Sequence, residues 1–212
     1  MSTLFQLPKY RLDPLIDGIF AVALTVLVLE IKVPELAHPG SARELLQALG
    51  QHVPVVLAYF VSFGLLGMFW VWHHRLSDKV RETDGPVLAC ILAFLSLVCF
   101  FPFAAAVFGR YIVHGNVASL LVYLPLVGLI LLSQTLYFYL AMRRGLLKPG
   151  LAPAEVASAH RRNVYTLGAF TLSCVPAALL LGVAPAVGCG VAGVLLLFVA
   201  RRVTVATQLP AT

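Results

Sequence analysis

The sequence predicts an all-α integral membrane protein with six transmembrane helices in a single unit, residues 1–212. Composition is the first observation: 60% of the residues are hydrophobic and 11% are charged, whereas a soluble domain carries about a quarter charged residues. Two further observations agree with it, namely six hydrophobic runs of membrane-spanning length and a one-sided distribution of the basic residues between them. Six spans use most of the chain and leave no room for a separate soluble domain.

The first span is predicted at about 14–32, within the run RLDPLIDGIFAVALTVLVLEIKVP. Lys9 and Arg11 precede it, as basic residues precede the apolar part of a signal peptide, but no small-residue cleavage site follows. Pro14 suits the first turn of a helix, where its missing N–H is not needed. We therefore expect a retained span and not a cleaved leader.

A polar segment, residues 34–52, separates the first two spans. It contains several helix breakers, and we expect residues 41–49 to form a short surface helix. The second span is predicted at about 53–73. It ends in Trp70 and Trp72, at the depth where indole rings prefer the membrane interface.

The remaining runs predict four more spans. The third, at about 86–109, contains Pro102, which should kink it. A fourth span is expected at about 117–141 and is followed by the most basic loop of the chain. The fifth and sixth spans, at about 164–182 and 184–200, are joined by a very short turn.

Basic residues gather in alternate segments between the predicted spans. With a cytoplasmic N-terminus, twelve of the 15 Lys and Arg residues lie on the cytoplasmic side, and only Lys32, Arg43 and Arg110 lie outside. An odd number of spans would put the termini on opposite sides and spoil this alternation. We therefore expect a multi-pass protein of the cell membrane with both termini cytoplasmic and a disordered tail at 203–212.

Several function classes lack support in the sequence. The formal charge of +6 arises at the ends of hydrophobic runs and not on one solvated surface, so no nucleic-acid partner is expected. The four cysteines fall in apolar runs without C-x-x-C spacing, as core residues do. His73 and His74 point about 100° apart on a helix and lack further ligands, so no resident metal is expected. Without a nucleophile elbow, an H-E-x-x-H motif or a phosphate loop, no enzyme and no cofactor are predicted.

The first predicted helix has three distinct faces. At about 100° per residue, three branched residues spaced i, i+4 and i+7 lie within roughly 60° of one another. These are Val22, Val26 and Leu29. Beside this stripe lies a face of small residues that permits close approach of another helix, formed by Gly18, Ala21 and Thr25. Asp17 lies about 140° from Val22, toward the far side.

We interpret the stripe as the lining of a pore. The chain shows no internal repeat and no TVGYG-type carbonyl filter, so one pore-quality helix per chain must combine with copies from other chains in a closed homo-oligomer. Taken alone, such a stripe more often faces lipid or core, and that alternative stays open. For Asp17, pairing with Arg11 or with the second-span histidines is expected ahead of a direct ion or proton site.

Arg11 and Asp17 stand six residues apart and are followed by the run Ala21-Val22-x-x-Thr25. This pattern resembles the transmembrane protein 175 channels of lysosomes and bacteria, in which R-x-x-x-F-S-D precedes an apolar A-[IV]-x-x-T run. Weaker similarities extend to the Trp-His end of the second span, the Phe-Pro-Phe of the third and the number of spans.

Two residues depart from that family pattern. Leu15 and Ile16 replace the phenylalanine and the serine of the motif. Loss of the serine hydroxyl removes a polar partner near Asp17, so the network around this carboxylate is expected to be rebuilt or weaker.

The resemblance implies a potassium-permeable cation channel, formed by bacterial subunits as tetramers whose first helices line the pore. Carried over by position, the narrowest apolar ring falls on Val22, with further layers at Val26 and Leu29. Thr25, on the flank, is placed to offer its hydroxyl to a passing cation. The expected partners are potassium and other monovalent cations in transit, the lipid bilayer and further copies of the chain.

The alternative function is a proton-coupled secondary transporter or a proton leak pathway that uses Asp17. A carboxylate with nearby histidines is able to relay protons through a membrane. The residues expected to form a structural polar network between the helices are Arg11, Asp17, Trp70 and His73.

Overall fold

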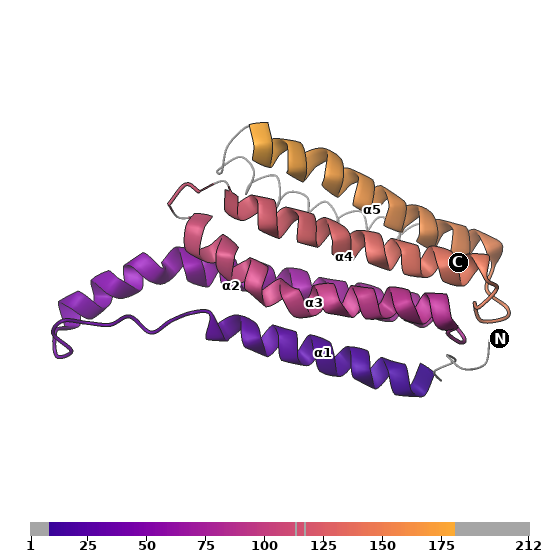
Figure 1. Cartoon of the computed structure of the whole chain (residues 1–212), viewed down its shortest axis with the longest axis horizontal. Coiled ribbons are helices and arrows are strands. Elements are labelled where there is room, and N and C mark those ends of the chain that lie inside the picture. The colour runs from indigo at the N-terminus through magenta and orange to yellow at the C-terminus, as the bar shows by residue number, and fades with distance from the viewer. Residues whose placement is uncertain (1–8, 113, 117, 181–212) are drawn as a thin grey trace, which may run out of the picture.

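Five long helices make up the described part of the chain. The computed structural model describes residues 9–112, 114–116 and 118–180, with side chains as far as residue 172. The helices are α1 (Lys9–Leu29), α2 (Ala42–Ser77), α3 (Gly85–Ile112), α4 (Ala118–Arg143) and α5 (Pro153–Leu180). They lie side by side and alternate in direction, so successive loops fall at opposite ends of the bundle (Figure 1). The expectation of an all-α membrane protein is therefore confirmed.

The helix α3 occupies the middle of the bundle. It packs against α1, α2 and α4, and α4 packs in turn against α5. Phe101 of α3 is fully buried and meets Phe69 of α2 edge to face, with ring centroids 6.3 Å apart. Because α1 contacts only α2 and α3 to any extent, it forms one edge of the bundle and leaves a long face free (Figure 1).

Four of the helices, α1 to α4, are long and apolar enough to cross a membrane. The predicted fifth span overlaps the second half of α5, whereas the sixth span at 184–200 and the tail at 203–212 lie outside the described residues. The six-span count therefore stays a prediction. The buried Pro102 lies inside α3, and this helix is continuous on both sides of it.

The start of α1 differs from the expectation. The helix begins at Lys9, so Pro14 lies inside it and not in its first turn. Lys9, Arg11 and Leu12, before Pro14, are good helix formers, and Leu12 is buried against the bundle. Tertiary packing of this extra turn stabilises the helix on the near side of the proline.

The expected short surface helix at 41–49 is not a separate element. Ser41 caps α2 by accepting a hydrogen bond from the Glu44 backbone N–H (3.3 Å), and the helix runs on from there through Pro54 to Ser77. Its 36 residues span about 54 Å, well beyond a hydrocarbon core of about 30 Å. The first turns of α2 consequently project past the rest of the bundle (Figure 1).

Candidate functional site

The helix α1 has one buried face and one free face. Five apolar residues at spacings of three and four pack toward α2 and α3. These residues are Leu12, Ile16, Phe20, Ala23 and Leu27. Phe20 is held against Phe94 of α3, with ring centroids 5.8 Å apart. Burial of this face fixes the rotation of α1 about its own axis, and hence which residues point away.

The predicted stripe lies on the free face. Val22 is 61% exposed and Leu29 is 65% exposed, while Val26 between them is partly covered. Contiguous branched apolar side chains that no other part of the described chain covers require either lipid or a second protein surface. The described part of the chain therefore leaves the stripe available for other contacts.

The small-residue face is also free. Gly18, Ala21 and Thr25 are exposed, and a methyl group built on Gly18 would meet nothing within 4 Å. No helix of the described chain uses this face for close packing. The Thr25 hydroxyl donates to the Ala21 and Val22 carbonyls at 3.0 and 2.9 Å, which leaves its oxygen lone pairs directed outward.

Asp17 is paired with Trp70. The indole Nε1–H of Trp70 donates to Asp17 Oδ1 at 2.8 Å, which ties the edge of α1 to α2. Arg11 is not its partner within the chain, because six residues along a helix place the two side chains about 120° apart. The Arg11 guanidinium lies instead 5.9 Å from the centre of the Tyr10 ring. Of the expected network, the structure brings Asp17 and Trp70 together.

His73 lies near this pair, in an aromatic stack. Its ring is 2% exposed and is stacked between Phe94 and Tyr137, at centroid separations of 4.7 and 5.2 Å. Neither ring nitrogen has a hydrogen-bond partner within the described part of the chain. His73 follows Trp70 by three residues, which turns it about 60° farther round α2 and into the core. Within the described residues, His73 contacts the expected network through ring packing and a shared cavity and not through a hydrogen bond, so its place in that network stays a prediction.

A second polar contact near the start of α1 is one that the sequence analysis did not predict. Ser77 of α2 donates from its hydroxyl to Asp13 Oδ1 at 3.2 Å, and its carbonyl accepts from the Lys9 ammonium. Lys9, Asp13 and Asp17 are spaced i, i+4 and i+8, so they follow one edge of α1. This spacing was the available signal, and it marks the edge along which α1 is attached to α2.

A small cavity lies between these contacts. Its volume is about 10 Å³, close to the lower limit for one water molecule. Asp13, Asp17, Trp70 and the two adjacent histidines are among its lining residues. Charged and titratable groups therefore surround a space of about one water molecule on the buried edge of α1.

The sequence matches the family model described as the endosomal/lysosomal potassium channel TMEM175 over residues 11–102. This range includes every residue proposed above for the stripe and for the polar network. A potassium channel of Streptomyces collinus is 34% identical over 162 residues, which cover 74% of this chain and 77% of that protein. The endosomal/lysosomal proton channel TMEM175 of Mus musculus is 36% identical over 97 residues, or 42% of this chain and 19% of that protein.

The fold has a solved counterpart. The crystal structure of a lysosomal potassium-selective channel TMEM175 homolog from Chamaesiphon minutus superposes with a TM-score of 0.76 at 27% sequence identity. The superposition covers 88% of this chain and 94% of that one. The two proteins therefore share nearly the whole of their architecture.

Proposed function

Because this chain belongs to the TMEM175 family of channels, we propose that it is a potassium-permeable cation channel whose pore is lined by α1. Four copies are expected to surround the pore in the cell membrane, with both termini cytoplasmic. A single observation carries the proposal: the stripe of Val22, Val26 and Leu29 faces away from the chain's own core. Packing of the opposite face against α2 and α3 holds the stripe in that direction.

Apolar rings are suited to closing such a pore. A narrow ring of branched side chains offers no hydrogen bonds to water, so the pore loses its water, and its conductance, as the ring narrows. In this proposal Val22 forms the narrowest ring, with Val26 and Leu29 as further layers. Thr25 lies on the flank of the stripe, where its outward lone pairs are able to replace part of a cation's hydration shell.

Val22→Asn tests the ring. The amide supplies donors and acceptors at the proposed constriction, so resting potassium conductance should rise by about tenfold, and discrimination between potassium and sodium should weaken. Planar-bilayer recordings of the purified protein under potassium and sodium gradients measure both quantities. Folding of each chain should remain intact, because Val22 is exposed and makes few contacts within the chain.

Val28→Asn is the matched control. Val28 is the same residue type on the same helix, is 46% exposed, and lies about 120° from Val22. The conductance and selectivity of the Val28→Asn variant should stay near those of the unmodified protein. Equal effects of the two substitutions would mean that the stripe has no special relation to the ion path.

A proton pathway past Asp17 is the second candidate function. The observation that favours it is the small cavity beside the Asp17–Trp70 hydrogen bond, which is surrounded by carboxylates and histidines. In that case Asp17→Asn would abolish a proton current while Val22→Asn left it unchanged. Recordings under a proton gradient, with saturable coupled flux in liposomes measured in parallel, separate this pathway from the pore along the stripe.

A further inference from the structure

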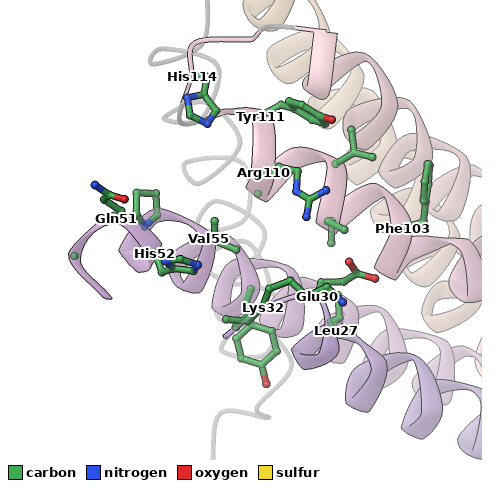
Figure 2. A pocket seen from close by; sticks show the side chains of 18 residues that line it. Leu27, Glu30, Lys32, Gln51, His52, Val55, Phe103, Arg110, Tyr111 and His114 are labelled. Carbon is green, nitrogen blue, oxygen red and sulfur yellow. The ribbon is translucent and has the colours of Figure 1, made fainter. Parts of the chain in front are cut away.

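A large pocket lies at the end of the bundle where α1 and α3 finish. Its volume is about 860 Å³, and it is formed by the last turn of α1 with the residues after it, the first half of α2 and the last turns of α3. Figure 2 shows side chains from all three helices around this space. The pocket lies on the buried side of α1, away from the exposed stripe, so it is distinct from the proposed pore.

The pocket collects most of the fixed positive charge at this end of the molecule. The α1–α2 and α3–α4 loops, with the helix turns next to them, contain three Lys or Arg residues, namely Lys32, Arg43 and Arg110. Two of these three, Lys32 and Arg110, line the pocket. Neither forms an ion pair with any residue that the structure describes, although Glu30 also lines the pocket. Two histidines, His52 and His114, lie at its edge (Figure 2).

Most of the remaining lining residues are apolar. Leu27, Val55 and Phe103 supply walls, and they come from three different helices. Beside the pocket, α2 and α3 approach closely, since a methyl group built on Gly109 would lie 3.2 Å from the Ala58 Cβ. The pocket therefore combines a mainly apolar lining with two basic side chains, at the end of the bundle where α1 and α3 finish.

We propose that this pocket binds an acidic glycerophospholipid, with its phosphodiester at Arg110 and Lys32 and its acyl chains along the apolar wall. Arg binds phosphate oxygens through two parallel N–H donors, and Lys adds a point charge. The fixed cations in the lining disfavour a metal ion, and no group of three metal-ligating side chains occurs within the described ranges. A lipid in this position would bridge α1, α2 and α3 and would stabilise the end of the pore-lining helix relative to the bundle.

Native mass spectrometry of the purified full-length protein tests the proposal, with phosphatidylglycerol and phosphatidylcholine as probes. Phosphatidylglycerol should bind more tightly, because the choline ammonium opposes Arg110 and Lys32. Arg110→Gln and Lys32→Gln should each weaken phosphatidylglycerol binding by about fivefold, the effect of about 1 kcal/mol per basic residue at a lipid surface. Glu30→Gln should strengthen it, because an opposing charge is removed from the pocket.

Arg43→Gln is the matched control, because Arg43 is an exposed basic residue at the same end of the bundle that does not line the pocket. It should leave lipid binding unchanged. The proposal is overturned if Arg43→Gln weakens lipid binding as much as both pocket variants. It is equally overturned if neither pocket variant changes lipid binding, which is the result expected when a second copy of the chain covers the pocket. It is also overturned if phosphatidylcholine binds equally well, if inorganic phosphate displaces the lipid, or if Glu30→Gln weakens binding. Lys32→Gln keeps the test decisive should Arg110→Gln fail to fold.

Discussion

Val22 and Leu27 lie five residues apart on α1 and meet opposite environments. Leu27 is 2% exposed within the bundle, whereas Val22 is 61% exposed on the free face. Beside Leu27, on the side away from Val22, lies the edge that carries Asp13 and Asp17, which is attached to α2 through Ser77 and Trp70. Individual polar contacts thus hold α1 in the rotation that directs the apolar stripe away from the chain.

Trp70→Phe and Asp17→Asn separate the hydrogen bond from the charge. Phenylalanine keeps an aromatic ring but removes the indole donor, so the free energy of unfolding should fall by about 1 kcal/mol, discounted because Asp17 is exposed in the single chain. Asparagine keeps an oxygen acceptor for Trp70 and removes only the charge. Thermal unfolding in detergent should therefore show a midpoint about 2–4 °C lower for Trp70→Phe and a smaller shift for Asp17→Asn.

The electrical outcome gives this pair a second test. With the pore along the stripe, both variants should alter opening or assembly while the potassium-to-sodium selectivity stays nearly constant. Loss of selectivity in Asp17→Asn, with Val22→Asn silent, would place the ion path beside the carboxylate and not along the stripe.

At the scale of whole elements, two loops are joined at the end of the bundle where α1 begins. The α2–α3 loop and the α4–α5 loop pair through an antiparallel bridge between Val80 and Leu147. Its hydrogen bonds run from the Arg81 N–H to the Leu146 carbonyl (2.8 Å) and from the Lys148 N–H to the Lys79 carbonyl (2.9 Å). The ion pairs Arg144–Asp84 and Lys79–Glu155 flank this bridge. The beginnings of α3 and α5 are consequently held together at the same end as the attachment of α1 to Ser77.

Asp84 has two roles in this arrangement, and two substitutions distinguish them. Its Oδ1 caps α3 by accepting from the Val87 backbone N–H (3.2 Å), and its Oδ2 accepts from Arg144. Asp84→Asn keeps the cap and loses the ion pair, which is weak because the Arg144 side chain is 47% exposed. Asp84→Ala loses both, so it should be less stable than Asp84→Asn by about 1 kcal/mol, or about 2–4 °C in the unfolding midpoint.

Glu82→Ala is the comparison for that pair. Glu82 pairs with Arg81, and both side chains are about half exposed, so the unfolding midpoint should hardly change. If Asp84→Asn and Asp84→Ala shift the midpoint equally, the ion pair and not the helix cap carries the contribution of Asp84.

On the scale of the whole molecule, α1 stands at the edge of the described bundle, and none of the other described helices covers its apolar stripe. Closed rotational symmetry is the simplest arrangement that gives every copy of such a stripe the same environment, and it brings the stripes together on one axis. A closed ring of this kind is compatible with the proposed tetramer, whose number of copies comes from the family resemblance and not from this geometry.

A cysteine at position 22 tests the tetramer. In a background with the four native cysteines replaced by alanine, Val22→Cys should form disulfide-linked dimers within the oligomer on mild oxidation, because residues of a closed ring approach within disulfide distance. Val28→Cys, on another face of α1, should form far fewer. Non-reducing gels of protein oxidised in native lipid measure both. A monodisperse monomer, in mild detergent as well as in lipid, would contradict the pore proposal altogether.

The sequence by itself determined the fold class and the character of α1. A composition of 60% hydrophobic residues indicates that the chain lies in a lipid bilayer. In a bilayer, only helices and closed barrels satisfy the hydrogen bonds of the backbone. The faces of α1 follow from its period of about 100° per residue, which is a local property of any helix. The spacing of Arg11, Asp17 and Thr25 likewise needs no tertiary information to indicate the family.

Only the tertiary structure decided which neighbours these residues meet. That Trp70 reaches Asp17, that His73 enters an aromatic stack with Phe94 and Tyr137, and that Ser77 holds the start of α1 all depend on residues at least 20 positions apart in the chain. Their contacts result from the rotation and the offset of whole helices, which are set by the summed packing of many side chains and not by any local pattern. For the same reason, the basic and apolar residues that form the pocket at the end of α1 come together only in the folded bundle.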